Sequence, residues 1–183
     1  MRYIHESAQS WNPPDDYTHL DLRNIEQEEF DSIIPLISPN VVDLEFNNCD
    51  IQHLLVPAGI KWLFAEDLGL RSVTLPESAD IVYLANNRLT TIKIPRSIMY
   101  LDVSKNRLKS VTSCGTFNRF AYLDVESNRN LKTLDFATSC KLMLKQDDDL
   151  LIGNLLKDWV LSEDELYKDS DGFPKFCVED FEF

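Results

Sequence analysis

A repeat of 19 residues runs through the middle of the chain and constrains its fold more than any other feature. Its clearest marker is an apolar residue followed by proline, which recurs at 56–57, 75–76 and 94–95. Aligned on these pairs, four copies begin at Val41, Ile60, Ala79 and Ile98. A fixed short period is the signature of a solenoid, so each copy is expected to form one turn of a stacked repeat protein.

Six apolar positions (1, 4, 6, 11, 14 and 16) define the repeat. In the four copies they make 24 sites, of which 23 are apolar and only Ser113 is not. The chain is 44% hydrophobic, so chance would fill about 11 of these sites. A fifth copy begins at Phe120, a weaker one at Ser139, and an irregular first one at Tyr17. The sequence therefore predicts about six to seven turns.

The residues inside each copy follow LxxLxLxx(N/C)xL, which resembles the leucine-rich-repeat signature. The strongest copies read VYLANNRL and YLDVSKNRL, and the ninth position holds Asn87, Asn106, Asn128 and, as the permitted alternative, Cys49. Leu68 departs from the pattern. The resemblance covers roughly residues 17–145. The short period and the Leu-Pro ending are similar to the repeats of about 20 residues in bacterial type III effector proteins. This resemblance implies a leucine-rich-repeat solenoid with parallel strands on a concave face and a ladder of inward asparagines.

Side-chain alternation leads to the same architecture. In LxLxx the leucines should face the core of a short strand and their neighbours should face outward. The residues expected to point inward are Leu44, Leu63, Val82, Leu101 and Leu123. Nineteen residues cannot hold a strand, two turns and a long helix, and proline at position 17 favours an extended return segment. We therefore expect a largely non-helical convex side.

The two ends of a solenoid would expose its core, so they are expected to be capped. Apolar spacing predicts a short helix within 25–37, ending near Pro35, and a second helix within 150–160. Ser162 before EDEL resembles the start of a further short helix. We divide the chain into a segment with the irregular first repeat and a cap (1–40), the repeats (41–146), and an acidic cap and tail (147–183). Independent domains at the two ends are the alternative interpretation.

The outward residues at positions 3 and 5 of successive strands should stack into one surface. Its apolar centre is predicted to comprise Trp62, Phe64, Ile81, Tyr83, Tyr100 and Tyr122. Its acidic rim is predicted to include Glu45, Glu66, Asp102 and Asp124. Apolar patches rimmed by charge mark binding sites, and aromatic residues dominate interface hot spots, so we predict a partner-binding site here. Two other interpretations stay open: the aromatics only stabilise the sheet, or the C-terminal tail covers them.

Motifs for catalysis, cofactors or metals are missing. Neither a Gly-rich phosphate loop nor GxSxG occurs, and Cys49 with His53 lacks a second ligand pair for zinc. The DSDG at 169–172 would place Tyr167 at the first ligand position of a calcium loop, which fails that motif. Three aspartates at 147–149 are typical of a solvated helix start. We expect a non-enzymatic protein without cofactor or metal.

Charge and targeting features indicate the compartment and the partner. The chain has 18 Lys and Arg against 31 Asp and Glu, a formal charge of -13. This balance disfavours direct binding to nucleic acid or to an anionic membrane. Four irregularly placed cysteines and no apolar N-terminal run favour a soluble cytoplasmic or otherwise intracellular protein, within a host cell if it is an effector.

These features predict an intracellular inhibitor, adaptor or effector that binds a protein partner with a basic surface through the concave face. The alternative from another class is an acidic mimic of nucleic acid that blocks a DNA- or RNA-binding protein. A mimic should lose binding steeply as salt rises, whereas an aromatic-centred interface should not. An enzyme with a pocket that the sequence does not indicate is the third possibility.

Overall fold

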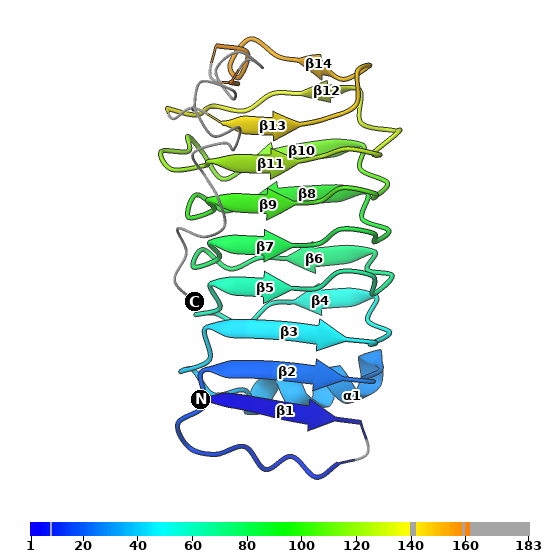
Figure 1. The fold of residues 1–183 in the computed structure, drawn as a ribbon, viewed down its shortest axis with the longest axis vertical. Helices are drawn as coiled ribbons and strands as arrows, with labels where there is room; N and C mark the ends of the chain where they lie inside the picture. Colours follow the sequence, from blue (N-terminus) through cyan, green and yellow to red (C-terminus); the bar gives the residue numbers. More distant parts are fainter. Residues whose placement is uncertain (8, 140–141, 159, 162–183) are drawn as a thin grey trace, which may run out of the picture.

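The chain forms a β-solenoid of parallel strands. The computed structural model describes residues 1–7, 9–139, 142–158 and 160–161. One strand from each turn joins a continuous eight-stranded sheet in the order β1-β2-β3-β5-β7-β9-β11-β13 (Figure 1). Its strands are β1 (Arg2–Glu6), β2 (His19–Arg23), β3 (Asp43–Asn47), β5 (Trp62–Phe64), β7 (Ile81–Tyr83), β9 (Tyr100–Asp102), β11 (Tyr122–Asp124) and β13 (Met143–Lys145). We call the outer surface of this sheet the eight-stranded face.

Short strands also line the opposite, convex side. They pair two by two: β4 (His53–Leu55) with β6 (Ser72–Thr74), β8 (Thr91–Ile94) with β10 (Ser110–Ser113), and β12 (Thr133–Leu134) with β14 (Leu151–Ile152). Proline follows soon after β4, β6 and β8, where a missing N–H ends the pairing. The prediction of an extended return segment is therefore confirmed.

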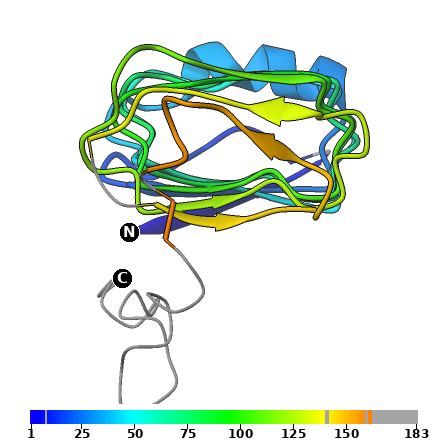
Figure 2. The same cartoon turned by 90° about the horizontal axis from the view of Figure 1, so that it is seen from above.

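The stack is nearly straight. Seen from above, successive turns overlay one another, with strands on both sides (Figure 2). Buried apolar side chains fill the interior between them. Neighbouring paired strands are separated by a similar distance on both sides of the solenoid. Each turn therefore adds the same height on both sides, and neither side is longer than the other. The predicted concave face is therefore close to flat along the stack, and the term convex side here means only the side opposite the eight-stranded face.

Inward apolar residues form the core as predicted. Leu44, Leu63, Val82, Leu101 and Leu123 each keep at most 1% of their surface exposed. Parallel pairing places each of them directly opposite the next, one turn along. The inward apolar residue of each turn is buried only because the neighbouring turns cover it. The stability of each turn therefore depends on its neighbours.

The predicted asparagine ladder is present. The Oδ1 atom of Asn87 accepts hydrogen bonds from the backbone N–H groups of Leu68 (3.2 Å) and Leu70 (2.9 Å) in the previous turn. Its Nδ2 atom donates to the carbonyl oxygens of Ala65 and Leu84. Asn106 and Asn128 make equivalent bonds. The ladder satisfies buried backbone groups at the corner where strand pairing stops.

Cys49 occupies the same ladder position with a thiol. Its Sγ atom donates to the carbonyl of Leu22 (3.3 Å) and accepts from the N–H of Ile25 (3.4 Å). The residue just before the ladder position takes a left-handed φ in each of these turns, at Asn48, Asp67, Asn86, Lys105 and Ser127. Asparagine and aspartate tolerate this conformation better than other non-glycine residues, which explains their frequency there.

The N-terminal end differs from the prediction. The helix expected within 25–37 forms as α1 (Gln27–Ile33), followed by the 3₁₀ turn η1 (Ile34–Leu36). It lies between β2 and β3 on the convex side, so it does not cap the end of the stack (Figures 1 and 2). The terminal strand is β1, which the repeat template missed and which adds a turn. Trp11 packs edge-on against Tyr3, with centroids 5.6 Å apart, beside the buried Tyr17.

The helix predicted within 150–160 is wrong for the described residues of that segment. They form β14 and a turn, because the open backbone edge of β12 offers pairing partners and Gly153 disfavours a helix. Leu150 and Leu156 are buried against the last repeat. This segment therefore covers the end as a further strand-and-turn layer. The helix start predicted at Ser162 lies outside the described residues.

Candidate functional site

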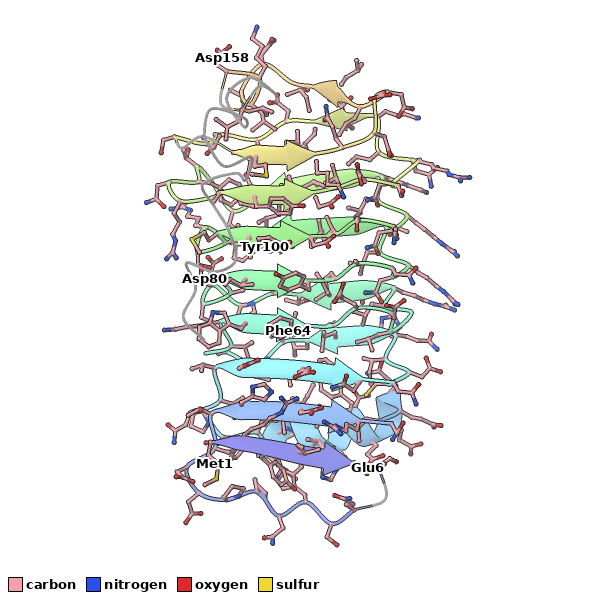
Figure 3. All side chains as sticks on the ribbon, viewed as in Figure 1. Met1, Glu6, Phe64, Asp80, Tyr100 and Asp158 are labelled. Atoms are coloured by element: carbon pink, nitrogen blue, oxygen red, sulfur yellow. The ribbon has the colours of Figure 1, made fainter. Side chains whose placement is uncertain are left out.

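The parallel register assembles the predicted binding residues on the eight-stranded face. One column follows position 3 of the repeat: Asp43, Trp62, Ile81, Tyr100 and Tyr122. The second column follows position 5: Glu45, Phe64, Tyr83, Asp102 and Asp124. Figure 3 shows Phe64 and Tyr100 on this face, projecting from β5 and β9. The structure therefore brings these outward residues together in two adjacent columns.

Four of the rings stack into a continuous series that we call the aromatic ladder: Phe64, Tyr83, Tyr100 and Tyr122. Phe64 and Tyr83 are nearly parallel, with centroids 5.3 Å apart. The ladder then crosses to the other column, with 4.8 Å between the Tyr83 and Tyr100 centroids. Tyr100 and Tyr122 are again parallel at 4.5 Å. All four rings are half-buried, so their mutual contacts still leave part of each ring at the surface.

Two predicted apolar residues flank the ladder and differ in exposure. Trp62 is half-buried, whereas Ile81 keeps only 5% of its surface. Ile81 lies opposite both Trp62 and Tyr100 in the sheet register. Its main contribution is therefore to pack between Trp62 and Tyr100 in their column, and the contact area for a partner comes from the aromatic side chains.

The ladder tyrosines are neutral and hydroxyl-bearing at physiological pH. Burial raises the pKa of Tyr122 to about 12, with the nearby Asp124 carboxylate adding to the effect. The pKa of Tyr100 is also raised, mainly by burial and further by Tyr83 and Tyr122. The hydroxyl of Tyr122 donates to Oδ2 of Asp124 at 3.4 Å. The face therefore presents rigid aromatic surface with polar edges, a composition typical of interface hot spots.

Most of the predicted acidic residues have partners within the chain. Asp124 is 4% exposed and binds the ammonium of Lys145 at 3.2 Å, while burial raises its pKa. Glu45 binds Arg2 at 2.8 Å and His19 at 3.2 Å. Asp102 accepts the N–H of Ser104.

Glu66 differs from the other predicted acids. It is exposed, and its pKa is raised by burial of part of the side chain and by its acidic neighbours Asp102 and Asp67. Glu66, Asp67 and Asp102 therefore form the region of the rim where negative charges crowd together. A cationic group from a partner would relieve that crowding.

A polar network on β1, β2 and β3 extends the face in a way that sequence reasoning missed. The carboxylate of Asp21 is fully buried and accepts hydrogen bonds from Arg2 (2.6 Å), Arg23 (2.7 Å) and Asn47 (2.8 Å). His19 lies between Asp43 (2.6 Å) and Glu45 (3.2 Å). From the sequence, residues 1–40 are assigned to an irregular first repeat, which includes HLDLR, and a cap, so Arg2 is not placed on the sheet. The alternation in RYIHE is the signal that could have placed Arg2 there.

A shallow depression joins this network to the ladder. Its volume is about 580 Å³, and it is lined by His19, Asp43, Glu45, Phe46, Asn47, Asn48, Phe64, Glu66 and Asp67. A depression lined by both carboxylates and an aromatic ring suits a cationic side chain such as arginine or lysine.

Within the described ranges, no group of three or more His, Cys, Asp or Glu side chains is arranged to hold a metal ion. The same part of the chain contains no helix long and apolar enough to span a bilayer.

The chain was also compared with known proteins. No protein-family model, curated protein or solved structure matches it.

Proposed function

We propose that the protein works by binding another protein through the aromatic ladder and its flanking carboxylates, without a catalytic step. The observation that carries this proposal is the ladder itself: four half-buried rings in continuous contact across four strands. Rigid aromatic side chains offer a large contact area at low entropic cost, which is what an interface centre requires. The regular sheet beneath them holds the surface in place before binding.

The partner we propose has a basic surface around an apolar centre. Glu66, Asp67 and Asp102 would orient such a partner and raise its association rate, while the rings would supply affinity. The depression beside Phe64 would take a lysine or arginine side chain. Such a protein would act as an intracellular inhibitor, adaptor or effector by covering a functional surface of its target.

We further assign the solenoid to the leucine-rich-repeat class, with short repeats similar to those of type III effectors. The LxLxx(N/C)xL pattern, the inward leucine rows and the bonded Asn87, Asn106 and Asn128 support this assignment. The strands on the convex side fit the short repeat, which leaves no length for a helix in the four regular copies.

Comparative capture from a host-cell lysate tests the proposal. Immobilised wild type should retain a partner that the double variant Tyr83→Ala, Tyr100→Ala loses. Leu55→Ala is the matched control, because Leu55 is 59% exposed on the convex side, and this variant should retain the partner. Equal capture by all three proteins would contradict binding through the ladder.

The same capture also separates the acidic-mimic alternative. A partner held through the ladder should stay bound when salt is raised, because apolar contact is not screened. If the captured protein instead binds nucleic acid, is released by salt and by competing DNA, and is kept by the double variant, the mimic function replaces the one proposed here.

A further inference from the structure

Basic side chains gather along one edge of the solenoid, where strands of the eight-stranded sheet turn toward the convex side. Arg88 and Arg107 both occupy repeat position 10 on consecutive turns, and Arg71 and Lys105 lie beside them. The N–H of Arg88 donates to the carbonyl of Leu70, and that of Arg107 to the carbonyl of Leu89, so each backbone sits directly on the previous turn. Figure 3 shows long nitrogen-tipped side chains projecting from this edge.

Two shallow grooves lie on this edge, and both are lined by Arg88 and Arg107. The first has a volume of about 370 Å³ and is lined by Asp67, Gly69, Asn86, Asn87, Arg88, Lys105, Asn106 and Arg107. The second has a volume of about 310 Å³ and is lined by Arg71, Arg88, Thr90 and Arg107. The space beside Gly69 in the first groove is open, since a Cβ atom there would meet nothing within 4 Å.

In the part of the chain that the structure describes, these four cations have no carboxylate within ion-pair distance, although several other basic residues do. Arg2, Arg119 and Lys145, for example, each bind a carboxylate within 3.2 Å. Among the described residues, no carboxylate lies within 4.0 Å of the charged groups of Arg71, Arg88, Lys105 or Arg107. The one acid lining the grooves, Asp67, accepts a hydrogen bond from Asn86. In a chain of net charge -13, four exposed cations around two grooves that only one acidic residue lines indicate a site for an anion.

We propose that this edge binds the phosphate groups of a multiply phosphorylated ligand. Guanidinium groups present planar forks of donors that match phosphate oxygens. Adjacent turns are about 4.8 Å apart, so Arg88 and Arg107 can hold neighbouring phosphates of one chain. The positive charge of three arginines and one lysine is larger than a single carboxylate would neutralise. Each groove is of a size that suits a small ligand.

Calorimetric titration of the full chain with inorganic triphosphate tests this site. Wild type should bind one triphosphate per chain, and Arg88→Ala with Arg107→Ala should weaken binding at least about tenfold. Lys61→Ala with Lys93→Ala is the matched control, because it removes two exposed positive charges outside the grooves and should leave binding unchanged. Tyr83→Ala with Tyr100→Ala should also bind normally, so this site and the aromatic ladder are tested separately.

Three outcomes would overturn the proposal. Wild type could give no saturable binding of triphosphate, or both arginine and lysine double variants could weaken it equally, which would indicate a general charge effect. A hexaglutamate peptide that binds as tightly as triphosphate would reassign the edge to carboxylate-rich ligands.

Discussion

The rings of Tyr100 and Tyr122 lie face to face on the eight-stranded sheet, with centroids 4.5 Å apart and planes 7° from parallel. Parallel pairing of β9 with β11 places these two residues opposite each other although a full turn of chain separates them. The contact shields both rings from water. Shielding disfavours the charged phenolate, which is why the pKa of both tyrosines is raised.

The ladder tyrosines should therefore ionise late in an alkaline titration. Because Tyr122 ionises near pH 10 when unfolded and near 12 when folded, the unfolded state loses its proton first. The free energy of unfolding should thus fall as pH rises from about 10 towards 12. Tyrosinate absorbance and denaturant unfolding at several pH values measure this. Tyr122→Phe should flatten the decline, and simultaneous ionisation of all tyrosines near pH 10 in the folded protein would contradict the burial of the ladder.

Replacing an asparagine of the asparagine ladder should lower the free energy of unfolding. Asn87→Ala leaves the N–H groups of Leu68 and Leu70 and the carbonyl of Ala65 without their side-chain partner. We expect a loss of about 2–4 kcal/mol in the free energy of unfolding, measured by urea titration. Asn118→Ala, at an exposed position, is the control and should stay within about 0.5 kcal/mol. If Asn87→Ala left the free energy of unfolding unchanged, the hydrogen bonds of the asparagine ladder would not stabilise the stack.

The buried carboxylate of Asp21 should contribute to stability above the acid range. Burial raises its pKa, but hydrogen bonds from Arg23, Asn47 and Arg2 outweigh that effect, so the pKa is lowered overall. Such a group stabilises the fold above its unfolded pKa of about 3.8, and the contribution is lost as pH falls through the folded value. Asp21→Asn should cost about 1–3 kcal/mol at neutral pH and less in acid. Asp15→Asn, at an exposed turn, should cost nothing measurable; equal effects of the two variants would refute this role.

Removal of the last layer should destabilise the stack. Truncation after Lys145 deletes the buried Leu150 and Leu156, and we expect the neighbouring Leu134 and Leu142 to become exposed. The loss should be about 3–6 kcal/mol, together with aggregation, in thermal unfolding and light scattering. Truncation after Leu161 keeps every described residue of this layer and should preserve the melting temperature. A stable, soluble protein ending at Lys145 would mean that 147–161 is an independent appendage.

The sequence predicted those parts of the structure that the repeat itself encodes. Strand alternation is local, so the sequence places Leu101 on the inner face and Tyr100 on the outer face, and the period then fixes which turn lies next to which. The sequence does not predict features that depend on contacts with other turns. The residues of β1 do not match the repeat pattern, yet they pair with β2. The segment at Gly153 pairs with β12 although its leucines have helical spacing. Arg88 and Arg107 are one repeat period apart, so the period places them on neighbouring turns, but only the structure shows that they line a groove together with Arg71.

The central claim is that the aromatic ladder carries partner binding, and the affinity of a purified partner for matched variants tests it most directly. Tyr83→Ala with Tyr100→Ala should weaken binding by about 100-fold or more, because two hot-spot rings each contribute about 2 kcal/mol, while the melting temperature changes by only a few degrees. Leu55→Ala should bind as wild type does. Unchanged affinity in the double variant, or a large loss of stability with binding intact, would contradict the account and assign the ladder a purely structural role.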